Sequence, residues 1–489
     1  MISDFKLFSI ILSIFFLASC SDNTDQSLNT AAETSSFPSS VEDASTAMGL
    51  DGVNAISLEG NAWRIRNSFR QTLTASPPWP ERDEINNWVQ TIDFSTPAML
   101  GSGDTFASNL FLLPPVAGVH RLEVPADSDS WRQQMEIWLT PWGFIKGAQR
   151  FGAETEVVEM NGSTFLKISW QSPGSMVAPS GLSYSVEGYV NNEGLVTRTE
   201  TRVEDAFMGD MHVVGVFSDY QDFGGLMVPT MMEQQRGGGG VFGVSVSTVS
   251  ANSVNLDELI NIPESSAPDI GGGNSEDTPV DLTEQVGEGA WLVKGGYVAL
   301  VVEFDDHLAV FEAGQSETRG EQIIQQIRDY ISDKEIRYVI NSHPHSDHTA
   351  GLVPFMREGA TLVTHEANVE FLDMALNTPR TLLGEEPLNA QVMGITGTGV
   401  LEDDTNRIEL HPVPNLHTEG MLVAVLPDHG LLFQADFTLP QPGSEANPFV
   451  KTLARYVEEN DIQFDRYLAV HAASVNQTRD DLLAAIAEE

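Results

Sequence analysis

Four side chains that commonly bind metal ions lie within six residues of one another, in the run His343-Pro344-His345-Ser346-Asp347-His348. Imidazole and carboxylate groups together suit Zn²⁺ and its first-row neighbours. The run follows a short buried strand that we expect at residues 336–340, and α/β folds place their ligands on loops at the ends of strands. A polar surface loop is the alternative interpretation, but this spacing at this position favours a metal site.

Three positions further along the chain extend this pattern. His417 is followed three residues later by Gly420, Asp436 follows the run Leu431-Leu432-Phe433-Gln434-Ala435, and His471 follows the short apolar run 468–470. The form H-x-H-x-D-H and the motifs after it, in this order, resemble the metallo-beta-lactamase superfamily. Ala435 departs from that pattern, because a Gly usually precedes the acidic ligand.

The resemblance covers roughly residues 279–489 and implies an αββα sandwich that holds two divalent metal ions, Zn²⁺ by preference. The implied ligands of the first ion are His343, His345 and His417. Those of the second ion are Asp347, His348 and His471. Asp436 is the implied ligand that both ions share. Asp347 is also the implied catalytic residue, because it would orient the nucleophile and accept a proton. A metal-bridging hydroxide would attack an ester, lactone, thioester or amide carbonyl of a small molecule. The bridging Asp without a Cys ligand is more similar to the glyoxalase II and lactonase branches than to most true β-lactamases.

Two other functions stay open at this point. A persulfide dioxygenase-like enzyme keeps several of the same ligands and would hold one iron. An envelope protein that binds lipid or lipoprotein would need only a structural metal domain, and residues 220–229 resemble the late strands of envelope lipoprotein-carrier folds. That second function predicts an apolar cavity within residues 46–263.

The elements around the ligand motifs predict an α/β layered fold. We expect strands at 291–303, 308–312 and 336–340, and a helix through Ile323, Ile327 and Ile331 that starts at a capping box over 318–321. Glu312 is expected either to orient a ligand or to brace its loop, and His365 is expected to be structural. Segments 373–400 and 437–449 are expected to be loops that shape a pocket.

Residues 46–263 predict a mainly antiparallel β domain. Alternating apolar residues indicate strands at 182–190, 195–203, 213–217, 226–232 and 241–249, with a turn at 191–194 and a loop at 237–240. One amphipathic helix is expected at 130–139. A linker rich in Gly, Ser and Pro at 264–278 separates this domain from the hydrolase-like domain at 279–489.

The chain has 489 residues, of which 41% are hydrophobic, so we expect two folded domains. Its 70 Asp and Glu against 25 Lys and Arg give a formal charge of −45, which repels phosphate backbones and excludes nucleic acid as a partner. The sequence leaves the oligomeric state open.

The N-terminus predicts export. A basic Lys6 precedes the apolar run 7–17, and residues 17–20 end in the single cysteine, Cys20. This resembles a bacterial lipobox, in which cleavage after residue 19 leaves the cysteine lipidated. We therefore expect a signal peptide at 1–19, a tether at 20–45, and a protein anchored by lipid at the periplasmic face of a bacterial membrane.

Overall fold

The computed structural model describes residues 37–66, 68–107, 116–126, 128–253, 282–295, 297–440 and 445–487. The expected signal peptide, Cys20, the start of the tether and the linker at 264–278 lie outside these residues. The tether expected at 20–45 extends too far toward the C-terminus. Ser40 already caps helix α1 (Val41–Ala47), and both Val41 and Ala44 are buried. No helix in the described part of the chain is long and apolar enough to cross a membrane.

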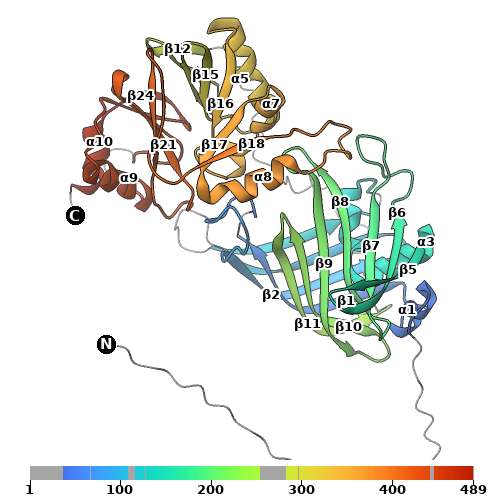
Figure 1. Cartoon of the computed structure of the whole chain (residues 1–489). Helices are drawn as coiled ribbons and strands as arrows, with labels where there is room; N and C mark the ends of the chain where they lie inside the picture. Colours follow the sequence, from blue (N-terminus) through green and yellow to red (C-terminus); the bar gives the residue numbers. More distant parts are fainter. Residues whose placement is uncertain are drawn as a thin grey trace, which may run out of the picture. The chain divides into compact units, whose positions relative to one another are not determined.

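The first half of the described chain forms one antiparallel sheet. Its strands are β1 (Ala55–Ile65), β2 (Arg82–Asp93), β3 (Ala98–Ala107), β4 (Val116–Val124), β5 (Glu154–Met160), β6 (Ser163–Gln171), β7 (Ser185–Val190), β8 (Val196–Asp205), β9 (Gly209–Asp222), β10 (Met227–Arg236) and β11 (Gly239–Ala251). The 11 strands are ordered β4-β3-β2-β1-β11-β10-β9-β8-β7-β6-β5, so that β1 pairs with the last strand, β11 (Figure 1). The predicted antiparallel β domain is confirmed.

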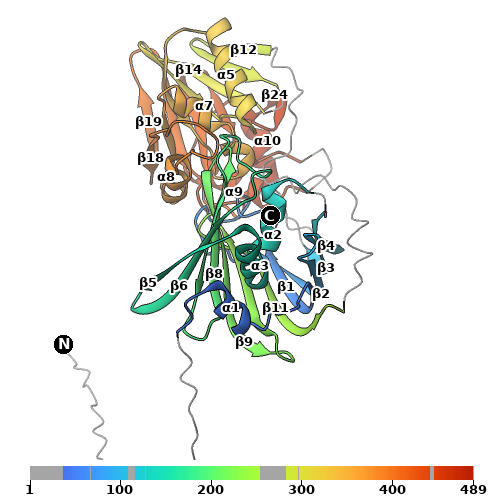
Figure 2. The ribbon, with the colours of Figure 1, turned by 90° about the vertical axis from the view of Figure 1, so that its right-hand side faces the viewer.

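Two helices, α2 (Trp131–Trp138) and α3 (Pro141–Phe151), pack against this sheet (Figure 2). The first is the helix that the sequence predicted. The second was not predicted, although Thr140 caps it and Pro141 occupies its first turn, which is a common start for a helix. Trp138, Trp142 and Trp170 are buried between the helices and the sheet and fix their packing.

The strands β1 to β6 were also missed, and for β1, β2 and β3 irregular pairing gives a physical reason. The pairing of β1 with β2 shifts register between Gly60 and Ala62, and the pairing of β2 with β3 shifts between Asn86 and Val89. Such irregularities interrupt the alternation of apolar and polar residues by which a strand is recognised. The loop predicted at 237–240 is shorter than expected, since Gly239 already belongs to β11.

The second half contains two further sheets. The first is ordered β12-β13-β14-β15-β16-β17-β18 and the second β19-β20-β21-β22-β23-β24. The bounds are β12 (Leu282–Gly287), β13 (Ala290–Lys294), β14 (Ala299–Glu303), β15 (His307–Phe311), β16 (Glu335–Ile340), β17 (Thr361–His365), β18 (Gln391–Ile395), β19 (Gly399–Glu402), β20 (Arg407–Pro412), β21 (Leu422–Leu426), β22 (Leu431–Gln434), β23 (Arg466–Ala469) and β24 (Ala472–Gln477). The helices are α5 (Glu317–Tyr330), α6 (Ser346–Thr349), α7 (Leu352–Arg357), α8 (Val369–Asn377), α9 (Pro448–Glu459) and α10 (Arg479–Leu483).

The two sheets form the inner layers of an αββα sandwich, as predicted. Alternate residues of β14 belong to different cores: Leu300 and Val302 pack with the second sheet, while Val301 packs with residues of α5 and α7. Strands buried on both faces read as continuous apolar runs, which is why residues 299–302 show no polar position.

Three expectations for this half need correction. The strand expected at 291–303 is two strands, β13 and β14, separated by a loop. Helix α5 begins at Glu317 with Ser316 as its cap, rather than at the capping box expected at 318–321. Segment 373–400 is not one loop, because it includes the end of α8 and the strand β18.

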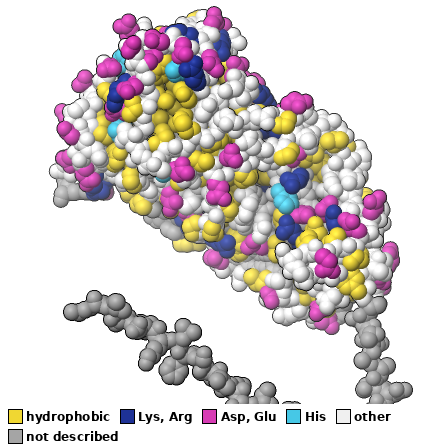
Figure 3. Space-filling model, in the orientation of Figure 1, with side chains coloured by type: hydrophobic (Ala, Val, Ile, Leu, Met, Phe, Trp, Pro, Cys, Tyr) yellow, Lys and Arg dark blue, Asp and Glu magenta, His cyan; other side chains and the backbone are white. Residues whose placement is uncertain are grey.

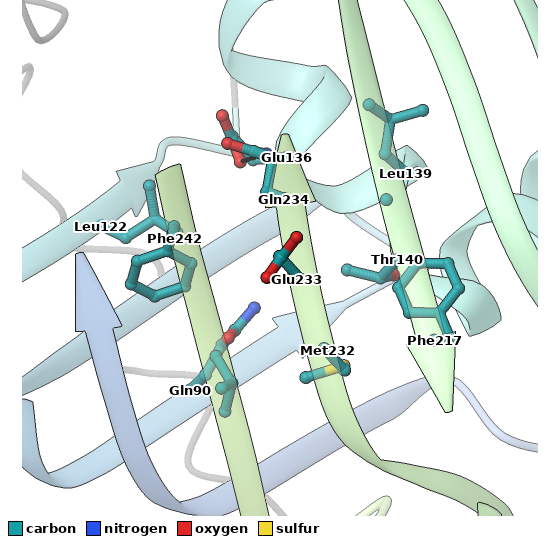
Figure 4. A pocket seen from close by; sticks show the side chains of 12 residues that line it. Gln90, Leu122, Glu136, Leu139, Thr140, Phe217, Met232, Glu233, Gln234 and Phe242 are labelled. Atoms are coloured by element: carbon teal, nitrogen blue, oxygen red, sulfur yellow. Dashed lines mark hydrogen bonds between the residues drawn. The ribbon is translucent and has the colours of Figure 1, made fainter. Parts of the chain in front are cut away.

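The antiparallel sheet holds a small cavity beside α2, lined by Leu122, Leu139, Phe217, Met232 and Phe242 among others (Figure 4). Its volume is about 60 Å³. A single water molecule needs about 10 to 15 Å³ of such space, so the cavity has room for a few water molecules but not for a lipid chain. This cavity therefore gives no support to the lipid-carrier alternative. Two larger pockets against the same sheet, of about 400 and 320 Å³, both have the charged side chains of Arg202 and Asp210 in their lining.

Candidate metal centre

The ends of parallel strands bring the predicted ligands to one edge of the sandwich. β15 and β16 run parallel in one sheet, and β22 and β23 run parallel in the other. The run 343–348 begins three residues after the end of β16 and enters α6. Asp436 lies two residues beyond β22, and His471 lies two residues beyond β23. His417 comes from the loop between β20 and β21.

The structure brings all seven predicted ligands together. Asp436 lies at their centre: its Oδ2 is 3.1 Å from His343 Nε2, 3.2 Å from His348 Nε2 and 3.5 Å from His417 Nε2. Its Oδ1 is 2.8 Å from His471 Nε2. The groups with ligand atoms within 4.8 Å of one another are His343, His345 and His417; His343, His348 and Asp436; and Asp347, His348 and His471.

Contacts on the outer side of the rings fix which nitrogen points inward. Nδ1 of His348 donates to Glu312 Oε2 at 2.8 Å, and Nε2 of His345 donates to the Thr72 carbonyl at 3.1 Å. A neutral imidazole that donates from one nitrogen offers a lone pair at the other. The ring of His343 is also held on its outer side, where its Nδ1 lies 2.9 Å from Ser342 Oγ. This outward anchoring is the usual arrangement of histidines that bind metals.

The electrostatics of the centre suit a cation. Although burial opposes its charge, the pKa of His348 is raised well above its usual value by Asp347, Glu312 and Asp436. Burial would raise the pKa of Asp436, but His348 and His343 hold it well below its usual value. Burial lowers the pKa of His343, which keeps that ring neutral. The raised pKa of His348 means that this ring carries a proton in the metal-free chain, and a metal ion bound among the ionised carboxylates would take the place of that positive charge.

Asp347 is oriented by two residues that the sequence did not indicate. Gln71 Nε2 donates to its Oδ1 at 2.8 Å, and the Tyr297 hydroxyl donates to its Oδ2 at 2.8 Å. Burial raises the pKa of Tyr297, with Asp347 as the next cause, so the phenol stays protonated and can donate. Neither residue lies near a ligand motif in the sequence, and no pattern would have identified them.

Glu312 performs both of the roles considered for it. Its Oε2 accepts from His348, and its Oε1 accepts the backbone N–H of Ser342 at 3.0 Å. The residue is fully buried and has a φ of 78°, which is rare for a residue with a side chain and is typical of functional sites.

His365 is structural, as expected. Its Nδ1 accepts from the N–H of Ala367 at 3.1 Å at the start of a short 3-10 helix, Glu366–Asn368. Burial lowers its pKa.

The comparison with protein families agrees with this geometry. Residues 293–488 match the family model of the metallo-beta-lactamase superfamily. No curated protein sequence matches the chain.

Solved structures similar to the chain include metallo-beta-lactamases at low identity. One is a metallo-beta-lactamase from Pontibacter korlensis, at 15% identity and a TM-score of 0.34, over 42% of this chain and 99% of that one. Another is FIM-1 from Pseudomonas aeruginosa in its mono-zinc form, at 17% identity and a TM-score of 0.33, over 42% of this chain and 96% of that one. With the family match and the grouped histidines, residues 293–488 are a domain of the metallo-beta-lactamase superfamily with side chains suited to bind metal ions.

Proposed function

We propose that the domain is a hydrolase that uses two divalent metal ions, zinc by preference, to cleave a small ester, lactone, thioester or amide. The observation that carries this proposal is the convergence of seven ligand side chains from four segments on one buried centre. His343, His345 and His417 would hold one ion, Asp347, His348 and His471 would hold the other, and Asp436 would be shared. Ions bound there would act as Lewis acids and activate water near neutral pH.

Asp347 is the residue that we propose to move protons. Its side chain is 24% exposed and that of His471 is 26% exposed, whereas those of His343 and His348 are fully buried. A substrate can therefore approach from the side of Asp347 and His471. Because Gln71 and Tyr297 hold both oxygens of Asp347, its carboxylate is oriented before a substrate arrives.

The location that we propose is the bacterial envelope, with the chain anchored through a lipidated Cys20. The support is the apolar run 7–17 and the lipobox-like end of the signal. Replacing Cys20 with Ala should move the protein from the membrane fraction to the soluble fraction. A variant that stays in the membrane fraction would argue against the lipid anchor.

The function is tested by measuring bound metals per chain and turnover of an ester, lactone and thioester panel. His345→Ala should lose metal and activity, while His365→Ala serves as a matched control, since it removes a histidine that lies outside the ligand set. Two zinc ions per chain with turnover lost only in His345→Ala is the expected result. One iron per chain would favour the dioxygenase instead, and bound metal without turnover would favour a non-catalytic domain.

A further inference from the structure

The segment 68–81, between β1 and β2, leaves the antiparallel sheet and contacts the metal centre. Its Arg70 carbonyl accepts the N–H of Ser346 at 2.9 Å, and its Leu73 carbonyl accepts the N–H of Glu419 at 2.8 Å and the hydroxyl of Thr418 at 3.1 Å. The segment therefore binds both to the ligand run after β16 and to the residues that follow His417.

Within this segment, Thr72 determines which nitrogen of His345 can bind a metal. Its carbonyl oxygen lies 3.1 Å from His345 Nε2, and a carbonyl can only accept, so Nε2 carries the hydrogen. The neutral ring then offers its lone pair at Nδ1. His345 and Thr72 are both buried, so water does not replace this hydrogen bond.

Gln71 acts on the other ligand group. Its side-chain amide donates to Asp347 Oδ1 at 2.8 Å and contacts Ser346 Oγ at 2.9 Å. One residue thereby fixes the orientation of the carboxylate and of the first turn of α6. A carboxylate that is held in place loses less conformational freedom when it binds a cation.

The segment is itself held firmly. The guanidinium of Arg70 is buried, donates to Thr349 Oγ1 at 3.1 Å, and lies 4.4 Å above the ring of Phe207 in the β8–β9 turn. Arg70 thus joins the segment both to α6 and to the antiparallel sheet. A charged group this deeply buried is stable only while its partners stay in place.

We propose that residues 70–73 are a positioning element of the metal centre that is supplied by the N-terminal sheet. Thr72 sets the tautomer of His345, Gln71 orients Asp347, and loading of the site depends on both halves of the chain. This inference rests on one part of the proposed function, namely that the site binds divalent metal ions. It also gives the N-terminal half a role in the site that no ligand motif indicated.

Zinc binding to Gln71→Met tests the proposal, because Met has nearly the same length but cannot donate. In competition with a chromophoric chelator, the full chain should lose about tenfold in affinity for the zinc ion held by Asp347. The ion held by His343, His345 and His417 should keep its affinity. Gln325→Met is the matched control, since Gln325 donates to Asp329 at the same 2.8 Å on the exposed face of α5.

Urea unfolding of the metal-free variants shows whether each one is folded. A Gln71→Met protein that is folded and binds both zinc ions like the wild type would overturn the proposal and leave the proposed function standing. Wild-type protein that binds no divalent ion would overturn both.

The tautomer is tested without any metal. Imidazole nitrogen shifts of His345 in the metal-free full chain, assigned by comparison with His345→Gln, should report a hydrogen on Nε2 and a lone pair on Nδ1. A hydrogen on Nδ1 would overturn the role assigned to Thr72.

Discussion

At the scale of single residues, Glu312 decides how His348 meets a metal ion. Its two oxygens accept from His348 Nδ1 and from the Ser342 backbone, so the same side chain sets the tautomer of a ligand and the path of the ligand loop. Its positive φ places the carboxylate in the core between the strand β15 and this loop. A carboxylate is needed here, because both partners donate.

Glu312→Gln should therefore weaken metal binding. The amide can accept from only one of the two donors, and its NH₂ group would face His348 Nδ1 and favour the tautomer with hydrogen on Nε2. We expect a loss of about 10- to 100-fold in zinc affinity, measured by chelator competition. Glu409→Gln is the control, since Glu409 contacts His411 away from the centre. Unchanged zinc affinity in Glu312→Gln would contradict this role.

At the scale of elements, the segment 378–385 docks on the β8–β9 turn. Its Thr381 and Leu382 line a pocket of about 400 Å³ there, together with residues of β7, β8 and β9. Asp210 accepts from Thr381 N at 3.1 Å, Thr381 Oγ1 at 2.6 Å and Leu382 N at 2.9 Å. Arg380 is buried and donates to the Ala206 carbonyl at 2.7 Å. These hydrogen bonds join the two halves of the chain independently of residues 70–73.

Asp210→Ala should weaken this junction, because three donors lose a buried acceptor. We expect a loss of about 2 kcal/mol in the free energy of unfolding of the antiparallel domain. Urea unfolding, followed by tryptophan fluorescence and circular dichroism, should change from one transition to two as the halves unfold separately. Asp222→Ala, at the exposed end of β9, is the control. A single transition at the wild-type midpoint would contradict the prediction.

At the scale of the whole molecule, the acidic excess is the dominant property. Asp and Glu side chains are spread over the visible face, with few Lys and Arg among them (Figure 3). A formal charge of −45 makes the folded chain repel itself, and dissolved ions screen that repulsion within about 10 Å at 0.1 M salt.

The thermal midpoint should therefore rise with salt. Between about 0.05 and 0.5 M NaCl we expect an increase of about 5 °C in a calorimetric scan. Screening depends on ionic strength alone, so KCl should have the same effect as NaCl. A midpoint that falls with salt, or that responds to only one of the two cations, would show that another effect is larger than self-repulsion.

The sequence by itself determined the parts of this protein that are local. The run 343–348 lies on one loop and one helical turn, so its spacing alone predicts a metal site, and the apolar runs around it predict the layered fold. The strands at 195–203 and 241–249 were predicted from the alternation of apolar and polar residues, which the register shifts in their pairing interrupt only locally.

The features that depend on contacts between distant residues were decided only by the tertiary structure. Gln71 and Tyr297 reach Asp347 from 276 and 50 residues away, and Asp210 meets Leu382 across 172 residues. No local pattern encodes such pairs, because each depends on where a sheet places a loop. The physical reason is that periodicity reports the face that a residue buries, whereas hydrogen bonds between distant loops depend on the packing of whole domains.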